Sequence, residues 1–257
     1  TTAAGALSTH HRSDNGLVDS THAGSIDQSM DYDDAGALAN LSYAYGGAAL
    51  FSQAIQRDAL GRVSQISENN FGTTRTLYYR YDQAGRLYGV KLNADTLATY
   101  AYDLNGNRIA VKTVAGTDSA TYDEQDRLIS RGVMASGYTR YTYTAAGELK
   151  SKTVGSAVTQ YVYDPLGNLV SVTLPNGDVV SYAADGTGRR VGRKLNGSWS
   201  GGWVYRNGLN VVADLDGAGA VVNRYVYGLS DQVPSLILNG ANAYRVITDQ
   251  LGSVRGV

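Results

Sequence analysis

The clearest pattern in the chain is an alternation of tyrosine with other residues that ends in a turn signal. The stretch Tyr79-Arg80-Tyr81-Asp82-Gln83-Ala84-Gly85-Arg86-Leu87 is the best example. Successive side chains of a strand point to opposite sides of a sheet, so both tyrosines fall on one face. Asp82 and Gly85 are typical of a tight turn, and Leu87 begins a second apolar alternation. The stretch therefore predicts a β-hairpin.

Variants of this stretch recur from residue 30 onward. The turn aspartate, or its substitute, stands at positions 33, 58, 82, 103, 123, 144, 164 and 185, which are 20 to 25 residues apart. Weaker copies follow around Asp216 and Asp249. A constant period in this range indicates a repeat architecture. Since a single hairpin is barely stable alone, the copies predict an all-β fold of hairpins stacked into one curled antiparallel sheet.

Each turn is predicted to be a type I turn followed by a bulge. The aspartate side chain accepts a hydrogen bond from the amide two residues on, and the glycine takes the left-handed conformation. Asp126 replaces this glycine and Thr144 replaces the aspartate in two copies. The predicted turn residues are Asp33, Gly36, Asp58, Gly61, Arg62, Asp82, Gly85, Arg86, Asp103, Gly106, Asp123, Asp126, Asp164, Gly167, Asp249 and Gly252.

The tyrosines before the turns form a predicted face of the sheet. Its members are Tyr79, Tyr81, Tyr100, Tyr102, Tyr141, Tyr143, Tyr161 and Tyr163. The chain has 20 Tyr but 2 Phe and 2 Trp. A tyrosine ring is apolar and its tip is polar, which suits the lining of a cavity. Direct stacking of these rings on carbohydrate is the second interpretation.

Two regions are predicted along the chain. Residues 1–29 lack clear periodicity and are expected to be irregular or only partly patterned, whereas residues 30–257 form the repeat sheet. Residues 1–30 contain no charged stretch followed by an apolar one, so no signal peptide is visible in this fragment. No apolar run approaches the roughly 20 residues of a membrane helix.

Charge and cysteine content exclude several classes of function. The chain has 22 Lys and Arg against 23 Asp and Glu, which is unlike a nucleic-acid-binding domain or a polybasic membrane patch. Without cysteine there can be neither disulfides nor thiolate sites. We therefore expect no nucleic-acid partner and no membrane span.

Candidate catalytic and metal-binding residues are few. His10, His11 and His22 cluster in the least patterned segment, and Asp214 with Asp216 falls short of a calcium loop. No nucleophile, phosphate-binding or zinc motif is present. We therefore expect no catalytic residue, no metal site and no cofactor.

Tyr79–Leu87 and Tyr161–Leu169 resemble the YD repeat of the RHS family, and the resemblance extends over roughly residues 30–255. The family includes bacterial polymorphic toxins, C subunits of insecticidal toxin complexes, wall-associated proteins and teneurins. The resemblance implies a β-sheet strip wound in a spiral into a hollow shell, which in the bacterial toxins encloses a C-terminal effector. It also implies a self-cleaving aspartyl site near the end of the core, which we expect beyond residue 257. Asp164-Pro165-Leu166-Gly167 has similar letters but is interpreted as an ordinary repeat turn.

The leading hypothesis is a non-enzymatic segment of an RHS-type shell, truncated before the end of the core. Its partners would be the rest of its own shell and a C-terminal effector domain. Unpaired sheet edges would also invite self-association. The alternative is an adhesion or carbohydrate-binding module that uses the tyrosine face. Either function implies a secreted or cell-surface bacterial protein.

Overall fold

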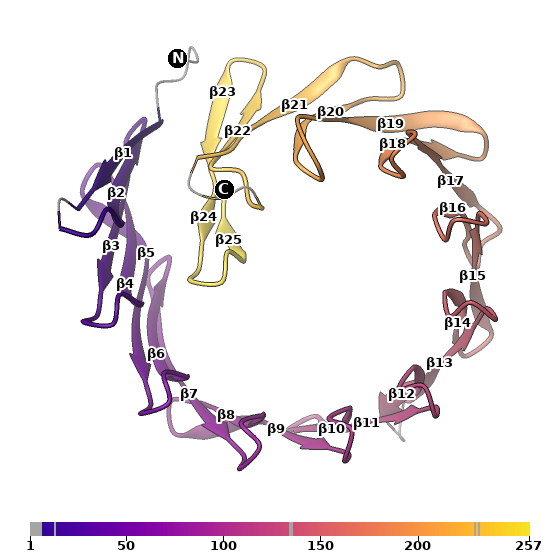
Figure 1. The fold of residues 1–257 in the computed structure, drawn as a ribbon, viewed down its shortest axis with the longest axis horizontal. Coiled ribbons are helices and arrows are strands. Elements are labelled where there is room, and N and C mark those ends of the chain that lie inside the picture. The colour runs from indigo at the N-terminus through magenta and orange to yellow at the C-terminus, as the bar shows by residue number, and fades with distance from the viewer. Residues whose placement is uncertain (1–6, 13, 134–135, 229, 231) are drawn as a thin grey trace. The chain divides into compact units, whose positions relative to one another are not determined.

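The computed structural model describes residues 7–12, 14–133, 136–228, 230 and 232–257. The described residues form strands β1 to β25, and all of their regular structure is β (Figure 1). Twenty-three strands belong to one antiparallel sheet, and β24 and β25 make a separate hairpin. The predicted all-β repeat fold is confirmed. None of the described residues forms a helix long and apolar enough to cross a membrane.

The chain divides into two compact units, and the first is discontinuous in sequence. It comprises Thr1–Asp95 and Asn223–Val257, and the second comprises Thr96–Val222. The strands of the first unit are β1 (Leu7–His11), β2 (Val18–Ala23), β3 (Ile26–Tyr32), β4 (Leu38–Tyr45), β5 (Ala48–Arg57), β6 (Val63–Asn70), β7 (Thr73–Tyr81), β8 (Leu87–Leu92), β22 (Leu236–Asn239), β23 (Asn242–Arg245), β24 (Ile247–Thr248) and β25 (Val254–Gly256).

The second unit contains the more regular repeats. Its strands are β10 (Arg108–Thr113), β11 (Gly116–Tyr122), β12 (Leu128–Val133), β13 (Gly137–Tyr143), β14 (Leu149–Val154), β15 (Ala157–Tyr163), β16 (Leu169–Thr173), β17 (Val179–Ala184), β18 (Arg190–Leu195), β19 (Ser198–Tyr205) and β20 (Val211–Leu215). Strands β9 (Asp95–Tyr102) and β21 (Val221–Val226) include the residues at which the two units meet in sequence.

The N-terminal segment is more ordered than the sequence suggested. Strand β1 pairs with β2, and β2 pairs with β3, so most described residues before position 30 belong to the sheet. The expected irregularity came from the many Ser, Thr, His and Asp side chains here, which hide the apolar alternation. The backbone still pairs because strand hydrogen bonds do not depend on side-chain polarity.

Each hairpin alternates covered and exposed side chains as predicted for a strand. In β7, Tyr79 and Tyr81 are half-buried, whereas Tyr78 and Arg80 are exposed. The partner strand β8 places Val90 opposite Tyr79 and Leu87 opposite Tyr81, with a shift of register between Arg80 and Tyr81. Such a bulge carries one extra residue into the turn that follows.

The apolar core lies in the first unit. Strands β3, β4 and β5 supply Met30, Leu41, Tyr43 and Phe51, and Ile247 of the C-terminal hairpin packs on them. Figure 1 shows that hairpin, β24–β25, beside the strands of the N-terminal sheet. The second unit buries few large apolar side chains, and Val172 is one of them. Its hairpins therefore depend more on turns and cross-strand pairs.

Truncation of a core leucine should test this distribution. Leu41 is 3% exposed and Leu60, in the turn before β6, is 76% exposed. We expect Leu41→Ala to lower the free energy of unfolding by about 2–5 kcal/mol, because it removes buried methyl groups and leaves a cavity. The matched change Leu60→Ala should stay within about 0.5 kcal/mol of the native value. Urea denaturation followed by circular dichroism measures both, and equal losses would contradict this core.

Candidate functional site

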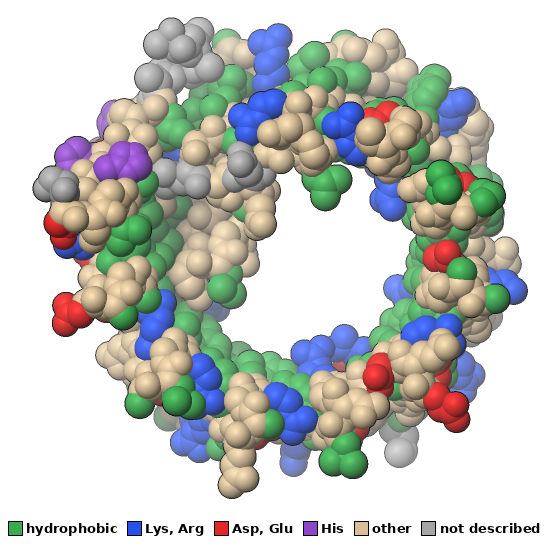
Figure 2. Space-filling model, in the orientation of Figure 1, with side chains coloured by type: hydrophobic (Ala, Val, Ile, Leu, Met, Phe, Trp, Pro, Cys, Tyr) green, Lys and Arg blue, Asp and Glu red, His purple; other side chains and the backbone are tan. Residues whose placement is uncertain are grey.

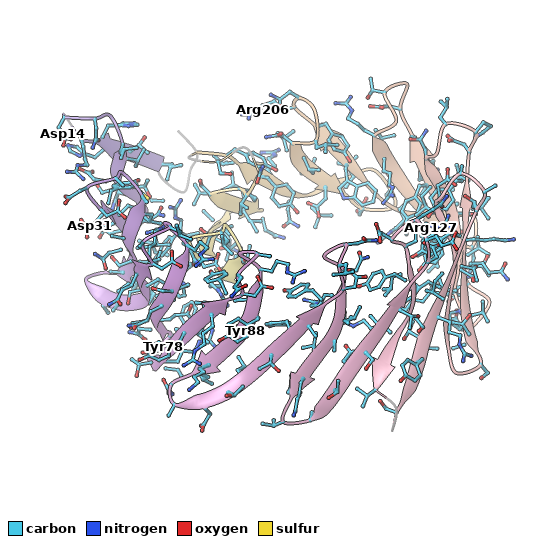
Figure 3. All side chains as sticks on the ribbon, turned by 60° about the horizontal axis from the view of Figure 1, so that its bottom comes forward. Asp14, Asp31, Tyr78, Tyr88, Arg127 and Arg206 are labelled. Carbon is cyan, nitrogen blue, oxygen red and sulfur yellow. The ribbon has the colours of Figure 1, made fainter. Side chains whose placement is uncertain are left out.

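The repeat turn is closed by one aspartate side chain that accepts several hydrogen bonds. At Asp123, Oδ1 accepts from the amides of Gln125 (3.0 Å) and Arg127 (2.9 Å), and Oδ2 accepts from Arg127 Nε (2.7 Å). The backbone adds bonds from the Asp123 amide to the Arg127 carbonyl and from the Asp126 amide to the Asp123 carbonyl. Arg127 is labelled in Figure 3. The amide four residues on was not foreseen from the sequence, which pointed to the amide two residues on.

The other predicted turn aspartates have the same geometry. Oδ1 accepts from the amide four residues on at Asp33, Asp58, Asp82, Asp103, Asp164 and Asp249, and also at Asp185 and Asp216. A side chain at that same position bonds Oδ2 in several copies: Arg62, Arg86, Asn107, Asn168 and Arg189. Thr144 and Glu148 exchange these roles, since Thr144 Oγ1 donates to the Glu148 carboxylate.

The fourth turn residue has a positive φ in every predicted copy. Gly36, Gly61, Gly85, Gly106, Gly167 and Gly252 have φ between 77° and 91°. Asp126 takes the same region with φ 60°. This region is costly for most side chains, and Asp and Asn tolerate it best after Gly. The residue type at this position therefore reports backbone geometry.

Arginine and tyrosine connect one repeat to the next. The guanidinium of Arg62 lies 4.4 Å from the centre of the Tyr81 ring, and Arg127 lies 5.0 Å from Tyr143. The same tyrosines donate from their hydroxyls to backbone carbonyls of the preceding strand, Tyr81 to Val63 (2.8 Å) and Tyr143 to Leu128 (2.8 Å). Each arginine thus closes its own turn and packs on the ring of the following hairpin.

The remaining tyrosines of the predicted face are also half-buried: Tyr79, Tyr100, Tyr102, Tyr141, Tyr161 and Tyr163. Burial raises the pKa of Tyr79, Tyr81, Tyr143 and Tyr163. The residues that alternate with them, such as Arg80, Ala101, Thr142 and Val162, are exposed. The rows therefore form the better covered side of the sheet.

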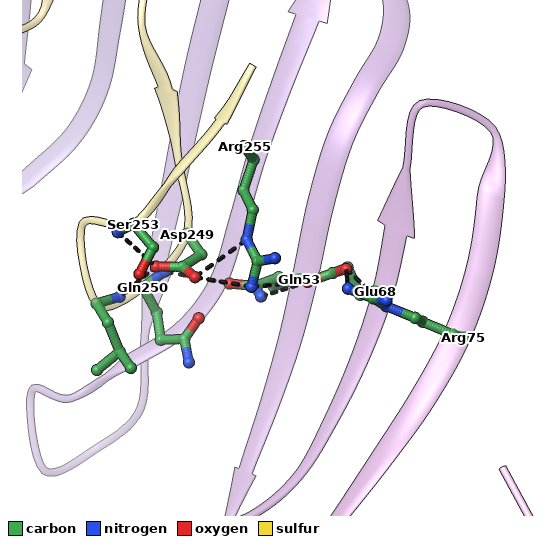
Figure 4. Close-up of polar contacts among 8 residues, drawn as sticks. Gln53, Glu68, Arg75, Asp249, Gln250, Ser253 and Arg255 are labelled. Atoms are coloured by element: carbon green, nitrogen blue, oxygen red, sulfur yellow. Dashed lines mark hydrogen bonds and ion pairs between the residues drawn. The ribbon is translucent and has the colours of Figure 1, made fainter. Parts of the chain in front are cut away.

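In the first unit this side of the sheet carries a buried polar network (Figure 4). We call the side that bears Thr21, Gln28, Tyr43, Gln53 and Glu68 the covered face, because residues 245–256, the C-terminal segment, lie on it.

Glu68 is the centre of the network. Its side chain is 0% exposed, and Oε1 pairs with Arg75 Nη2 at 2.7 Å. Oε2 accepts from Gln53 Nε2 at 2.8 Å and lies 3.9 Å from Arg255 Nη2 of the C-terminal segment. A buried carboxylate is tolerated only with such partners, so the loss of either arginine would leave its charge less well compensated.

Asp249 and its turn connect the C-terminal segment to the same network. It closes a repeat turn by accepting from the amides of Leu251 (2.9 Å) and Ser253 (2.9 Å). Its Oδ2 lies 2.9 Å from Arg255 Nη2, so Arg255 links this turn to Glu68. The amide of Gln250 donates to Gln53 Oε1 at 3.1 Å. The turn is therefore both a local structure and a contact with the sheet.

Arg245 is a second buried anchor of this segment. Its Nη2 donates to Thr21 Oγ1 (2.9 Å) and Gln28 Oε1 (2.7 Å), and its guanidinium lies over the Tyr43 ring. Burial lowers the pKa of Arg245. Tyr43 and Thr248 add a hydroxyl contact of 3.1 Å. Gln28, Gln53 and Glu68 were not predicted from the sequence, although polar residues at apolar positions of the alternation are a signal for such a network.

Two of the histidines contact aspartates of the N-terminal strands. His10 contacts Asp19 (2.8 Å) and His22 contacts Asp27 (2.6 Å), and the histidine side chains gather over β1 and β2 on the surface in Figure 2. Among the residues that the structure describes, no three His, Cys, Asp or Glu side chains are placed to share a metal ion. Asp164 closes its turn through Leu166 and Asn168, like the other repeat aspartates.

These features define a β-hairpin repeat protein with a covered and an exposed sheet face. The family described as Teneurin YD-shell matches residues 2–257, and the chain belongs to this family. The RHS/YD-repeat resemblance is thereby confirmed.

The chain is similar to individual proteins of very different organisms. It is 25% identical over 230 residues to Teneurin-4 of Mus musculus, which covers 86% of this chain and 8% of Teneurin-4. It is 30% identical over 141 residues to the toxin protein Tse5 of Pseudomonas aeruginosa, covering 52% of this chain and 10% of Tse5. It is 29% identical over 147 residues to the tRNA3(Ser)-specific nuclease WapA of Bacillus spizizenii, covering 56% of this chain and 6% of WapA. The chain therefore spans about a tenth or less of each relative.

Replacement of a turn glycine should show the cost of the left-handed conformation. Gly106 has φ 91° and Gly186 lies in a similar turn without a positive φ, and a Cβ at either would meet no atom within 4 Å. We expect Gly106→Ala to lower the free energy of unfolding by about 1–2 kcal/mol and Gly186→Ala to leave it nearly unchanged. Gly106→Asp, which copies Asp126, should cost less than Gly106→Ala. Equal effects of the two alanine changes in urea denaturation would show that the positive φ of Gly106 is not the cause of the loss.

The turn carboxylates should also make the fold sensitive to acid. The Arg127 amide and guanidinium hold the pKa of Asp123 below its usual value, and the Arg62 guanidinium does the same for Asp58. A lowered pKa means that the ionised form is favoured in the folded state. Its stabilisation is present above the unfolded pKa of about 3.9 and is lost as the pH falls through the folded pKa. We expect the free energy of unfolding to decline below about pH 4.

A charge-neutral variant separates this effect from general acid unfolding. Asp123→Asn should make the decline shallower, because one ionisable turn group is gone. Glu124→Gln, at an exposed position of the same turn, should keep the native slope. Chemical denaturation at several pH values measures the slopes, and identical slopes for both variants would disprove the assignment.

Proposed function

We propose that this chain is a non-enzymatic segment of an RHS-type shell that encloses a C-terminal effector domain and helps to deliver it. The observation that carries the proposal is the C-terminal segment, which is anchored on the covered face through Arg245, Ile247 and Arg255. The similarity to the toxin protein Tse5 supports a role in a toxin, and the family membership supports a shell.

The geometry explains why the anchor suits such a role. The polar network and Ile247 hold the end of the described chain against one side of the sheet. A domain that follows Val257 would therefore begin on the covered face rather than on the exposed one. Carboxylates of the network are engaged by arginine or amide donors, so they serve as fasteners and not as reacting groups.

The partners of this segment follow from the same proposal. They are the remaining repeats of the same shell and the effector domain, and the protein acts outside the cell or at its surface. Self-association through unpaired sheet edges stays a prediction.

Protease protection of the following domain tests the proposal. In the full-length gene product that contains these residues, we expect the domain beyond Val257 to resist limited proteolysis, whereas the same domain produced alone is digested rapidly. Ile247→Asn should weaken the protection, because Ile247 is the residue of the C-terminal segment that packs into the apolar core, and the change buries a polar group there. Val254→Asn in the same hairpin is the control, since Val254 is exposed.

Two results would overturn the proposal. One is digestion of the domain in the full-length protein at the rate of the isolated domain. The other is a gene product without a domain beyond Val257.

A further inference from the structure

A small cavity in the second unit surrounds an exposed tryptophan on the sheet face opposite the tyrosine rows. The cavity measures about 290 Å³, and its lining includes Gly192, Trp199, Leu215 and Asp216. Strand pairing sets Lys194 opposite Trp199 and Gly192 opposite Gly202, while Tyr182 pairs with Arg193 on the other face. Trp199 is 52% exposed. A large apolar ring that stays open to solvent is informative when it lines a cavity.

The backbone beneath the tryptophan is shaped to receive it. A Cβ on Gly192 would lie 2.5 Å from Trp199 Cζ3, so the indole lies directly over a residue without a side chain. A Cβ on Gly217 would lie 2.3 Å from the Trp199 carbonyl oxygen. The register also shifts between Arg193 and Lys194, which marks a bulge at Trp199. Bulges redirect a side chain relative to its strand. The ring is therefore supported from below and partly free above.

Two charged groups accompany the ring. Lys194 Nζ lies 4.5 Å from the ring centre. Asp216 closes its turn through Oδ1, which accepts from the amides of Ala218 and Ala220. Ala220 stands where Arg127 or Asn168 bonds Oδ2 of its turn aspartate in other repeats. Asp216 is exposed and lines the cavity, so its Oδ2 is directed to no equivalent partner and is available to a ligand.

We propose that this cavity binds a neutral sugar ring. The C–H face of a pyranose packs on an electron-rich aromatic face, and its hydroxyls bond to the Asp216 carboxylate and the Lys194 ammonium. The cavity volume is at the lower end of the range for ligand sites, which suits a single ring of a longer glycan. A cationic ligand would compete with Lys194 for the tryptophan, and an acidic sugar would be repelled by Asp216.

The tyrosine rows are a poorer platform for the same ligand. Tyr81, Tyr143 and Tyr205 donate their hydroxyls to backbone carbonyls, and guanidinium groups cover their rings. At Trp199 the cation contact is the single ammonium of Lys194, and the residue is still 52% exposed. The proposal is independent of the shell function, because it concerns the other sheet face of one unit.

Tryptophan fluorescence can test this site directly. The chain has only Trp199 and Trp203. Trp203 follows Gly202, which pairs with Gly192 of the cavity, so Trp203 falls on the opposite, tyrosine side of β19. In a Trp203→Phe background, titration with maltohexaose, cellohexaose or chitohexaose reports on Trp199 alone. We expect at least one of these glycans to change the emission with a Kd of about a millimolar.

Matched variants decide whether the cavity is responsible. Isothermal titration should show at least about tenfold weaker binding by Trp199→Ala, and several-fold weaker binding by Asp216→Asn, which keeps the turn acceptor Oδ1. Trp203→Phe should bind as the native chain does. Urea denaturation checks that each variant is folded. The proposal fails if none of the three glycans binds at up to about 10 mM, or if Trp199→Ala binds as tightly as Trp203→Phe.

Discussion

A carboxylate that accepts backbone amides is the interaction on which this sheet depends. In the turn of a hairpin the two strands no longer pair. Without the aspartate, the amides of the turn would therefore lack hydrogen-bond acceptors. The repeat aspartate supplies those acceptors within five residues, and the arginine or asparagine at the end of the turn completes its second oxygen. Since the aspartate and its donors lie on one short segment, each turn can form without help from the rest of the chain.

The arginine of the turn also connects one hairpin to the next. Arg62 and Arg127 pair with their own aspartates and lie over the rings of Tyr81 and Tyr143 in the following repeats. Such links occur in both units, and the second unit depends on them more because it buries few large apolar side chains. The first unit has in addition an apolar core, in which Tyr43 and Phe51 pack under Ile247, and a polar network that fixes where the C-terminal segment lies. Because hydrogen bonds and ion pairs need particular partners, a polar interface of this kind favours a single position of the C-terminal segment on the sheet.

The repeat turns could be predicted from the sequence because they are local. Asp123, Asp126 and Thr144 gave enough chemistry to assign positive φ, side-chain acceptors and the bulge. The all-β repeat fold followed from the spacing of these turns, and the family was suggested by the resemblance of Tyr79–Leu87 and Tyr161–Leu169 to the YD repeat. The buried network could not be predicted, because Glu68 meets Arg255 only after the intervening chain has folded back. The cavity at Trp199 was also missed, because Gly192 and Gly217 look in the sequence like ordinary turn glycines. The tyrosine rows led to the carbohydrate alternative, which stays a prediction. The structure adds that the hydroxyls of Tyr81 and Tyr143 donate to backbone carbonyls within the sheet.

The discontinuity of the first unit has a consequence for the order of folding. Tyr43 and Thr248 touch across 205 residues of sequence. During synthesis, the strands around Phe51 emerge long before Ile247 exists to cover them. Loop-closure entropy makes such a contact slow to form, and an uncovered apolar face favours aggregation in the meantime. The second unit, with its local turns, can fold during this interval. Completion of the first unit must therefore wait until the second unit and the strands after it have been synthesised.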